Sequence, residues 1–379
     1  MKRKVADLVK ILALSLALIG VIVLFNKKDN TGGEDNSVDN VYDFAMGTSV
    51  QVTIYGNEDK DFKANDVVDE IKKLDEEVIS WREEGSELYK LNHEYVIGEP
   101  YRISDILYEA LISSYDICDK SKGALDITIR PLALLWNIEE ADDESFVVPA
   151  EKEIKNALKN VGYNAIHIYD SEEVELDGNE DEVYDSEASG YSLDKYIILD
   201  KENFLLDLGA TGKGYALDIA YKSLTEHNVD GAMVSVGGSI LVYGTKDSGK
   251  NNDAWRVGIR NPKGSQEDMI GYLEFPCAKD FQKYISTSGN YEKFVQKDGT
   301  IYHHILDSST GYPASSGLAG VTVVCENGLI SDGLSTACYV LGYERSLDLL
   351  RAYNAEAVFV DEENNVTVTD GLEGIYHSN

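Results

Sequence analysis

Hydrophobic and polar positions alternate along this chain with two different periods. Between residues 50 and 54 every second position is apolar, which predicts a strand with one buried face. Between residues 67 and 78 the apolar positions are three or four residues apart, which predicts a helix with one apolar stripe. The helical spacing returns between Ile106 and Tyr115, and Ser104 just before it is a residue type that caps helices. Both helices are therefore expected to pack on a sheet.

Short apolar segments dominate the second half of the chain, and most of them are too short to be helices. Strands are predicted at residues 204–206, 232–236, 240–243, 255–259, 284–287, 291–295, 301–306, 321–324 and 357–360. Helices are predicted at about 213–224, 332–341 and 344–353. This mixture predicts the α+β class, with a large and mainly antiparallel sheet flanked by helices.

The first residues have the order that protein-export machinery reads. Three basic residues at positions 2–4 precede a run without charged residues at 11–25. No Ala-x-Ala-like cleavage site follows, so an uncleaved anchor is expected over residues 1–28, with removal of this segment as the alternative. Residues 29–40 are rich in Asp, Asn, Gly and Ser and are expected to form a flexible linker. The folded domain is then expected over 41–379, on the outer side of the cell membrane.

Acidic residues outnumber basic ones by 68 to 34 and give the chain a formal net charge of -34. Such a charge repels phosphate backbones, so nucleic acid is not an expected partner, and a solubilising surface explains the composition. The stretch from Asp170 to Glu187 holds many of the acids and no Lys or Arg, which predicts an exposed insertion at about 170–190. The residue spacing of a calcium-binding loop is absent from that stretch.

The four cysteines are far apart in the sequence, at Cys118, Cys277, Cys325 and Cys338. No Cys-x-x-Cys pair or histidine at metal-ligand spacing accompanies them, so no zinc or iron–sulfur site is expected. Their apolar neighbours predict buried thiols, and a disulfide is the alternative in an exported protein.

A glycine-rich segment, Asp207–Gly214, lies between a predicted strand and a predicted helix. Its three glycines allow a ligand to approach the backbone closely, and a helix N-terminus that carries a lysine, here Lys213, attracts phosphate. The spacing differs from that of a Walker loop, and no Ser or Thr follows the lysine. A phosphate cradle and a plain strand-to-helix turn both explain this segment.

A second group of candidate residues lies between 285 and 313. Hydroxyl residues and glycine leave room there for a ligand, while His304 offers a base and Asp307 an acceptor. Neighbouring residues of a strand face opposite sides, so only one of His303 and His304 can point into a given site. The other histidine is then expected to be structural.

A third group, Asp332–Ala337, begins a predicted helix. Asp332 and Thr336 are four residues apart and therefore lie on one helical face. Their oxygen atoms suit a hard cation such as Mg²⁺, whereas capping of the helix by Asp332 is the alternative.

Taken in order, from Met46-Gly47-Thr48 to the Asp-x-x-Ser-Thr-Ala helix at Asp332, these motifs resemble those of the ApbE-type FAD:protein FMN transferases. The resemblance extends from about Val41 to the C-terminus. It implies an ApbE-like, T-fold-related structure. It also implies Mg²⁺-dependent transfer of the FMN moiety of FAD to a Ser or Thr hydroxyl of another protein, with release of AMP.

The resemblance assigns roles to individual residues. The positions that correspond to flavin contacts are Met46, Trp81, Ala124, Leu125, Asp126, Asp207, Lys213 and Leu306. The magnesium site corresponds to the carbonyl oxygen of Ala210 and the side chains of Asp332 and Thr336. The chain departs from the usual family residues at Thr211, Ser239, Asn290 and Ser308. These departures leave the implied metal ligands and His304 in place.

The implied mechanism divides the work among a few groups. Mg²⁺ and Lys213 would neutralise charge as AMP departs, His304 would take the proton of the acceptor hydroxyl, and Asp307 would orient the strand or the imidazole. Exported flavoproteins of electron-transport systems are the expected acceptors, because the domain is expected outside the membrane. Two alternatives use the same residues: a metal-dependent FAD pyrophosphatase with water as the nucleophile, and a non-catalytic extracytoplasmic FAD-binding protein.

Overall fold

The computed structural model describes residues 38–171, 194–246, 254–265 and 267–379. The predicted anchor at 1–28 and most of the predicted insertion at about 170–190 lie outside these ranges. The predicted linker at 29–40 overlaps them at its end, where a strand begins at Val38, so the folded part starts before the predicted boundary at Val41. Within the described part of the chain, no helix is both long and apolar enough to cross a membrane.

The described residues divide into two compact units, and the chain passes between them several times. Unit 1 contains the described residues up to Lys73, those between Lys213 and Glu292, and Ser315–Asn379. Unit 2 contains the described residues between Leu74 and Gly212, and Lys293–Ala314.

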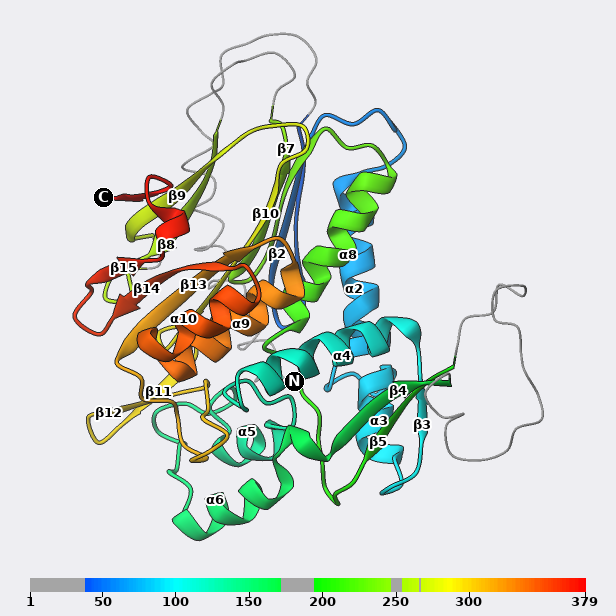
Figure 1. The fold of residues 1–379 in the computed structure, drawn as a ribbon, viewed down its shortest axis with the longest axis vertical. Coiled ribbons are helices and arrows are strands. Elements are labelled where there is room, and N and C mark those ends of the chain that lie inside the picture. The colour runs from blue at the N-terminus through cyan, green and yellow to red at the C-terminus, as the bar shows by residue number, and fades with distance from the viewer. Residues whose placement is uncertain (1–37, 172–193, 247–253, 266) are drawn as a thin grey trace. The chain divides into compact units, whose positions relative to one another are not determined.

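Unit 1 is built on an eight-stranded sheet in which every neighbouring pair of strands is antiparallel (Figure 1). In sheet order the strands are β1 (Val38–Ala45), β2 (Thr48–Tyr55), β6 (Gly231–Val236), β7 (Ser239–Gly244), β10 (Gln282–Gly289), β13 (Leu318–Cys325), β14 (Glu356–Asp361) and β15 (Val366–Val368). A smaller antiparallel sheet consists of β16 (Tyr376–Ser378), β9 (Met269–Pro276) and β8 (Ala254–Arg260). The predicted antiparallel architecture is thereby confirmed.

The helices of unit 1 carry the apolar stripes that the sequence predicts. They are α2 (Ala64–Leu74), α8 (Gly212–Glu226), α9 (Gly328–Leu341) and α10 (Tyr343–Ala352), the first and second of which run across a unit boundary. Figure 1 shows α9 along β10 and β13, against which it packs, and α10 packs on α9. The stripe of α2 is buried as far as Leu74, and then Ile79 rather than Val78 is buried, because the helix widens into a π turn over Asp75–Ile79.

Unit 2 combines short helices with two small sheets. Its helices are α3 (Glu87–Glu94), α4 (Asp105–Lys120), α5 (Arg130–Trp136) and α6 (Glu151–Ala157). Its sheets are β3 (Tyr101–Ile103) with β5 (Lys195–Leu199) and β4 (Ile166–Asp170), and the pair β11 (Phe294–Lys297) with β12 (Thr300–His303). The predicted cap of α4 is confirmed, because Ser104 Oγ accepts a hydrogen bond from the Leu107 amide at 3.2 Å. A core around Trp136, Phe146 and Leu306 joins α5 and α6 to the β11–β12 pair.

The predicted strand at 204–206 is wrong. A side chain, rather than a neighbouring strand, satisfies the backbone there: Asn92 Nδ2 donates to the Leu206 carbonyl at 2.9 Å, and Asn92 Oδ1 accepts from the Leu206 amide at 2.7 Å. Asn92 is buried, so water does not compete for these bonds.

Other predicted elements differ at their ends. The predicted strands at 291–295 and 301–306 correspond to the shorter pair β11 and β12, so His304 lies just after a strand instead of within it. The strand β9 was not predicted. Helix α9 begins before the predicted start, and Asn327 Oδ1 caps it by accepting from the Ile330 amide at 2.9 Å. Asp332 therefore lies in the second turn, and the alternative that it caps this helix is wrong.

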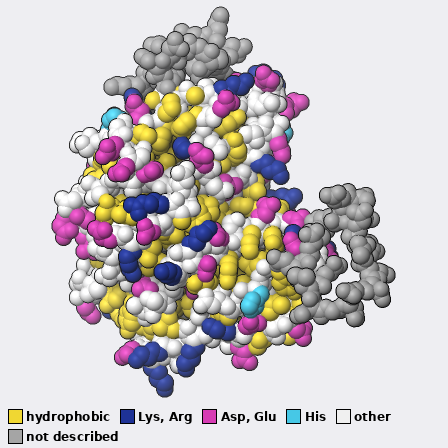
Figure 2. Space-filling model, viewed as in Figure 1, with side chains coloured by type: hydrophobic (Ala, Val, Ile, Leu, Met, Phe, Trp, Pro, Cys, Tyr) yellow, Lys and Arg dark blue, Asp and Glu magenta, His cyan; other side chains and the backbone are white. Residues whose placement is uncertain are grey.

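Charged side chains of both signs are interspersed over the face shown in Figure 2. Acidic groups are scattered among Lys, Arg and apolar side chains there, instead of forming one continuous patch. This pattern suits a solubilising surface.

Candidate functional site

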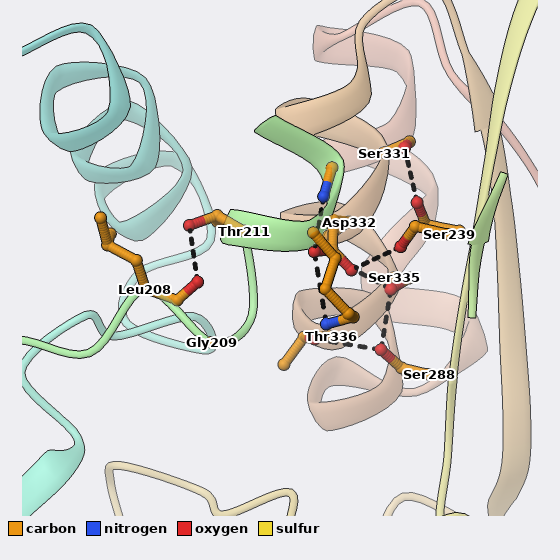
Figure 3. A network of polar contacts seen from close by, with 12 residues as sticks. Leu208, Gly209, Thr211, Ser239, Ser288, Ser331, Asp332, Ser335 and Thr336 are labelled. Atoms are coloured by element: carbon orange, nitrogen blue, oxygen red, sulfur yellow. Dashed lines mark hydrogen bonds and ion pairs between the residues drawn. The ribbon is translucent and has the colours of Figure 1, made fainter. Parts of the chain in front are cut away.

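The carboxylate of Asp332 in unit 1 is buried and surrounded by hydrogen-bond donors (Figure 3). Its Oδ2 accepts from the amide of Gly214 at 3.0 Å and lies 3.4 Å from Lys213 Nζ. Its Oδ1 accepts from the Ser239 hydroxyl at 3.1 Å. Asp332 is 2% exposed, and a carboxylate so far from water requires such partners. The sequence-predicted residues Lys213 and Asp332 are thus brought together.

Hydroxyl groups extend this polar region along α9 toward Thr336. The Oγ atom of Ser288 lies 2.7 Å from Ser335 Oγ and 3.0 Å from Thr336 Oγ1, and Ser335 Oγ donates to the Asp332 carbonyl at 2.8 Å (Figure 3). Strand β10 and helix α9 therefore meet through oxygen atoms at this point, where alkyl groups would be usual in a core. Oxygen-rich surroundings of this kind are what hard cations prefer.

Two glycines allow helices α8 and α9 to begin side by side. A Cβ atom on Gly214 would lie 2.0 Å from the carbonyl oxygen of Gly328, and one on Gly328 would lie 2.2 Å from that of Gly214. Asp218 of α8 accepts hydrogen bonds from the amides of Gly328 at 2.7 Å and Leu329 at 2.8 Å. The first turn of α9 thus receives acceptors from α8 that a helix cannot provide for itself. Asp332 lies one turn further along this joint.

The glycine-rich turn before α8 belongs to unit 2 and is organised by its own polar groups. Asp207 Oδ1 accepts from the Gly209 amide at 2.7 Å. The Leu208 carbonyl accepts from the amides of residues 211–212, at 3.0 and 2.6 Å. Ala210 lies two residues before α8, so its carbonyl is not part of the helical hydrogen-bond ladder.

Two guanidinium groups cover the indole ring of Trp81 in unit 2. The Cζ atom of Arg130 lies 3.0 Å from the ring centroid, and that of Arg82 lies 3.9 Å from it. Two planar groups at these distances cannot share one face, so they cover both. Arg130 is buried and paired with Asp207 at 3.4 Å; burial lowers the pKa of Arg130, and Asp207 opposes this effect. Arg130 therefore links two of the predicted flavin positions, Trp81 and Asp207.

The imidazole of His304 is held against the main chain directly after β12. The His304 amide donates to the Lys293 carbonyl at 3.1 Å, and Nδ1 lies 3.2 Å from the same oxygen. A carbonyl oxygen can only accept, so Nδ1 carries the proton and Nε2 is the acceptor nitrogen of the neutral ring. Burial and then the charge of Lys293 lower the pKa of His304 to about 4, which keeps the ring neutral at pH 7.

The neighbouring candidates His303 and Asp307 make structural contacts. His303 is buried, and its Nε2 donates to the Ala314 carbonyl at 3.0 Å. Asp307 Oδ1 accepts from the amide and the hydroxyl of Ser309, at 2.8 and 2.6 Å. Asp307 was predicted to orient either the strand or the imidazole. Its contacts organise the chain after His304, whereas the carbonyl of Lys293 orients the imidazole.

The described residues contain no group of three or more His, Cys, Asp or Glu side chains arranged to hold a metal ion. All four cysteines lie among the described residues, and none forms a disulfide; Cys118, Cys325 and Cys338 are buried thiols, as their apolar neighbours predict, whereas Cys277 is only half-buried. Burial raises the pKa of each of the three buried thiols, which makes them poor nucleophiles.

Comparison with known proteins places this geometry in a family. Residues 46–359 match the family model described as the ApbE family, which is most of the chain. The chain belongs to the ApbE family. A member from Treponema pallidum, named FAD:protein FMN transferase, is 29% identical over 342 residues, which cover 87% of this chain and 86% of that protein. One of the same name from Escherichia coli K12 is 24% identical over 291 residues, which cover 77% and 74%.

Solved ApbE structures have the same fold. The crystal structure of the ApbE protein of Thermotoga maritima matches with a TM-score of 0.71 at 26% identity, and the match covers 90% of this chain and 100% of that one. The apo form of the flavinyl transferase ApbE from Pseudomonas stutzeri matches with a TM-score of 0.70 at 24% identity, covering 92% and 100%. The ApbE-like fold predicted from the motifs is confirmed.

Among the other predicted flavin positions of this ApbE-family chain, Met46 lies in a tight turn of unit 1. Met46 and Gly47 connect β1 to β2, and both have positive φ angles, of 54° and 69°. This is the geometry of a two-residue hairpin turn, and it leaves the Met46 side chain half-buried.

The predicted positions 124–126 and Leu306 lie within unit 2. Asp126 is buried, and burial raises the pKa of its carboxyl group. Its Oδ1 accepts hydrogen bonds from the amide and the hydroxyl of Thr128, at 2.8 and 2.6 Å. Its Oδ2 accepts one from the Tyr163 amide at 3.2 Å. Leu125 and Leu306 are buried, and Leu306 belongs to the core of the unit. These contacts stabilise the unit, and Ala124 is the half-buried member of the set.

Three charged residues near the candidate positions of unit 2 were not predicted from the sequence: Arg130, Glu139 and Lys293. Arg130 could have been noticed, because it is the charged first residue of an otherwise apolar segment at 130–136. Glu139 and Lys293 form an ion pair across 154 positions of sequence, and no local pattern joins residues that far apart.

Proposed function

We propose that this ApbE-family chain is an FAD:protein FMN transferase, the activity for which its relatives are named. It would move the FMN moiety of FAD to a Ser or Thr hydroxyl of an acceptor protein and release AMP. The observation that carries this proposal is the 3.2 Å contact between His304 Nδ1 and the Lys293 carbonyl oxygen, because a proton on Nδ1 leaves Nε2 to accept another. A protein that only stores FAD has no need of a positioned base.

The residues around Asp332 fit magnesium by the chemistry of their atoms. Asp332 and Thr336 supply a carboxylate and a hydroxyl oxygen on one face of α9 in unit 1. The family resemblance implies the carbonyl oxygen of Ala210 as a third ligand. The Asp332 carboxylate is buried, and a divalent cation would neutralise it. Bound there, Mg²⁺ would stabilise negative charge on the pyrophosphate oxygens.

His304 and Lys213 would have different tasks in the reaction. The acceptor hydroxyl oxygen forms a bond to the phosphorus of the FMN moiety, the bond from that phosphorus to the AMP oxygen breaks, and the hydroxyl proton passes to His304 Nε2. Lys213 would offset the charge of the departing phosphate. Trp81 would offer a ring for stacking once a guanidinium moves away.

The proposed location follows from the N-terminal sequence. A basic segment followed by an apolar run at 11–25 supports a membrane anchor with the enzyme outside the cytoplasm. Exported flavoproteins of electron-transport systems are then the proposed acceptors. Protease treatment of intact cells and of lysed cells tests this location, because only an extracytoplasmic domain is cleaved in intact cells.

A single assay separates the proposed function from its two alternatives. The protein is incubated with FAD and MgCl₂, with and without a candidate exported flavoprotein, and AMP, FMN and covalent flavin on the acceptor are measured. Transfer predicts a fluorescent acceptor band after denaturing electrophoresis, and AMP in equal amount. Equal release of FMN and AMP without acceptor would indicate hydrolysis, and FAD binding without AMP would indicate a binding protein. His304→Ala should lower transfer at least about a hundredfold.

A further inference from the structure

Glu139 lies between the residues that cover Trp81 and those that hold His304, all within unit 2. Its Oε1 accepts from Lys293 Nζ at 2.8 Å, and its Oε2 accepts from Arg82 Nη2 at 2.7 Å. Arg82 lies on the Trp81 ring, and the carbonyl of Lys293 accepts from the amide and Nδ1 of His304. An unbroken series of contacts therefore runs from the indole ring to the imidazole, and Glu139 is its centre.

We propose that Glu139 is a positioning residue for His304, which it serves by fixing Lys293 and by placing a negative charge near the imidazole. The proposal rests on the proposed transferase function, in which His304 takes the proton of the acceptor hydroxyl. Glu139 belongs to none of the motifs found in the sequence. It lies in a turn just after α5.

The positional part of this role comes from the two ends of Lys293. The Lys293 side chain is paired with Glu139, and the Lys293 carbonyl orients the imidazole. Movement of the Lys293 side chain therefore changes the position of the imidazole. Without Glu139 the Lys293 side chain would lose this ion pair. The Lys293 carbonyl, which accepts from His304 Nδ1–H, would then be less constrained. A general base depends on this kind of alignment with the proton that it accepts.

The electrostatic part comes from the charge of Glu139. Burial opposes its ionisation, but Lys293 and Arg82 outweigh burial and lower the pKa of Glu139 to about 2, so it is ionised at neutral pH. Its side chain is 31% exposed, and solvent therefore weakens these attractions. The charged and titratable groups that face His304 are Lys293 and His303, which lower its pKa, and Glu139, which raises it. Arg82 acts on His304 through its pairing with Glu139.

Two substitutions in this group are expected to move the pKa of His304 in opposite directions. Lys293→Met removes a neighbouring cation but keeps the carbonyl, so the pKa of His304 should rise. Glu139→Gln removes the neighbouring anion, so the pKa should fall. Because the pI of the chain is about 4.4, the second effect is best measured in the Lys293→Met background, where the titration lies further from the pH of lowest solubility.

The experiment is an NMR titration of the His304 ring in the full chain, for Lys293→Met alone and combined with Glu139→Gln or with Glu140→Gln. Glu140 is the matched control, an exposed carboxylate beside Glu139. The double variant with Glu139→Gln should titrate at least about half a pH unit lower than Lys293→Met, and the Glu140→Gln control should not. Equal titration of all three proteins would overturn the proposal. If the double variant is not folded by circular dichroism, Glu139→Gln alone is titrated against the wild type.

Acceptor labelling by otherwise wild-type protein adds a second readout. Glu139→Gln should lower the labelling rate at pH 7.5 about tenfold, and Glu139→Asp, which keeps the charge, should recover part of the loss. Labelling by Glu139→Gln at the wild-type rate would count against the proposal. Absence of labelling by the wild type would instead refute the transferase function, while the ring titration would still report on Glu139.

Discussion

The amide of Gly214 donates a hydrogen bond to Oδ2 of Asp332 at 3.0 Å, which connects the first turn of α8 to the second turn of α9. The bond exists because no side chain separates the two helices. A Cβ atom on Gly214 would lie 2.0 Å from the Gly328 carbonyl oxygen and 2.7 Å from Asp332 Cβ. The Gly328 carbonyl is part of the backbone and Asp332 Cβ is attached directly to the backbone, so neither atom can move away without shifting helix α9.

Gly214→Ala is therefore expected to lower the free energy of unfolding by about 1–3 kcal/mol, measured by urea denaturation. The control is Gly85→Ala, where the nearest atom to the new Cβ lies 3.9 Å away and the change should be close to neutral. Similar losses in both variants would show that the close approach of α8 and α9 is not the cause.

Asp332→Asn should weaken Mg²⁺ binding at least about tenfold, because the only carboxylate among the three proposed ligands is lost. Isothermal titration calorimetry of the purified protein with MgCl₂ measures this directly, without an acceptor. Asp348→Asn on α10 removes an equal charge from a side chain that is 96% exposed and should leave the affinity unchanged. Equal Mg²⁺ affinities of the two variants would contradict the proposed metal site. Chelation with EDTA should also stop AMP release by the wild type.

Trp81→Leu should weaken FAD binding by up to about tenfold, since it removes the ring on which the cofactor would stack. Quenching of protein fluorescence and the fluorescence of FAD itself both report the affinity. Tyr272→Leu is a suitable control, because it also removes a ring beneath a guanidinium, that of Arg256 at 6.0 Å, from strand β9 of unit 1. Unaltered FAD affinity in Trp81→Leu would exclude Trp81 as a flavin contact.

Burial of the Asp218 carboxylate, which caps α9, should make stability depend on pH. Burial raises the pKa of Asp218 to about 6, although the amides of Leu329 and Gly328 oppose this shift. The folded-state pKa is above the unfolded value of about 3.9, so the contribution to stability is complete below about pH 4 and is lost as the pH rises through 6. The loss is up to about 3 kcal/mol.

Asp218→Asn removes this titration. The free energy of unfolding of the wild type should therefore fall relative to that of the variant as the pH rises from 4 to 7. Chemical denaturation at several pH values gives the difference, in which other titrating groups cancel. A difference that is constant over this range would mean that Asp218 has a normal pKa in the folded protein.

Local periodicity predicted the parts of this structure that depend on neighbours in sequence. The strand at 50–54, the helix after Ser104 and the shared face of Asp332 and Thr336 are examples, because the spacing of side chains alone determines them. The glycine-rich turn and the His304 segment were recognised as candidates by the chemistry of their residues, which is also local in sequence.

Contacts between distant residues were beyond such patterns. The segment at 204–206 has the composition of a strand, yet the side chain of Asn92 takes the place of a neighbouring strand. The tautomer of His304 depends on the carbonyl of Lys293, whose position depends in turn on the fold of unit 2. Sequence could therefore name the proposed base but not the residues that orient it.

The segment that carries His304 interrupts a connection between paired strands. Gly289, the last residue of β10, pairs with Gly320 of β13, whereas the chain between them leaves unit 1 at Lys293 and returns at Ser315. The sheet would need only a short hairpin turn here. The register of β10 and β13 is therefore set by the strands themselves, whereas Val295 and Leu306 of the segment between them are buried in the core of unit 2, so a change in this segment acts on unit 2 rather than on the sheet.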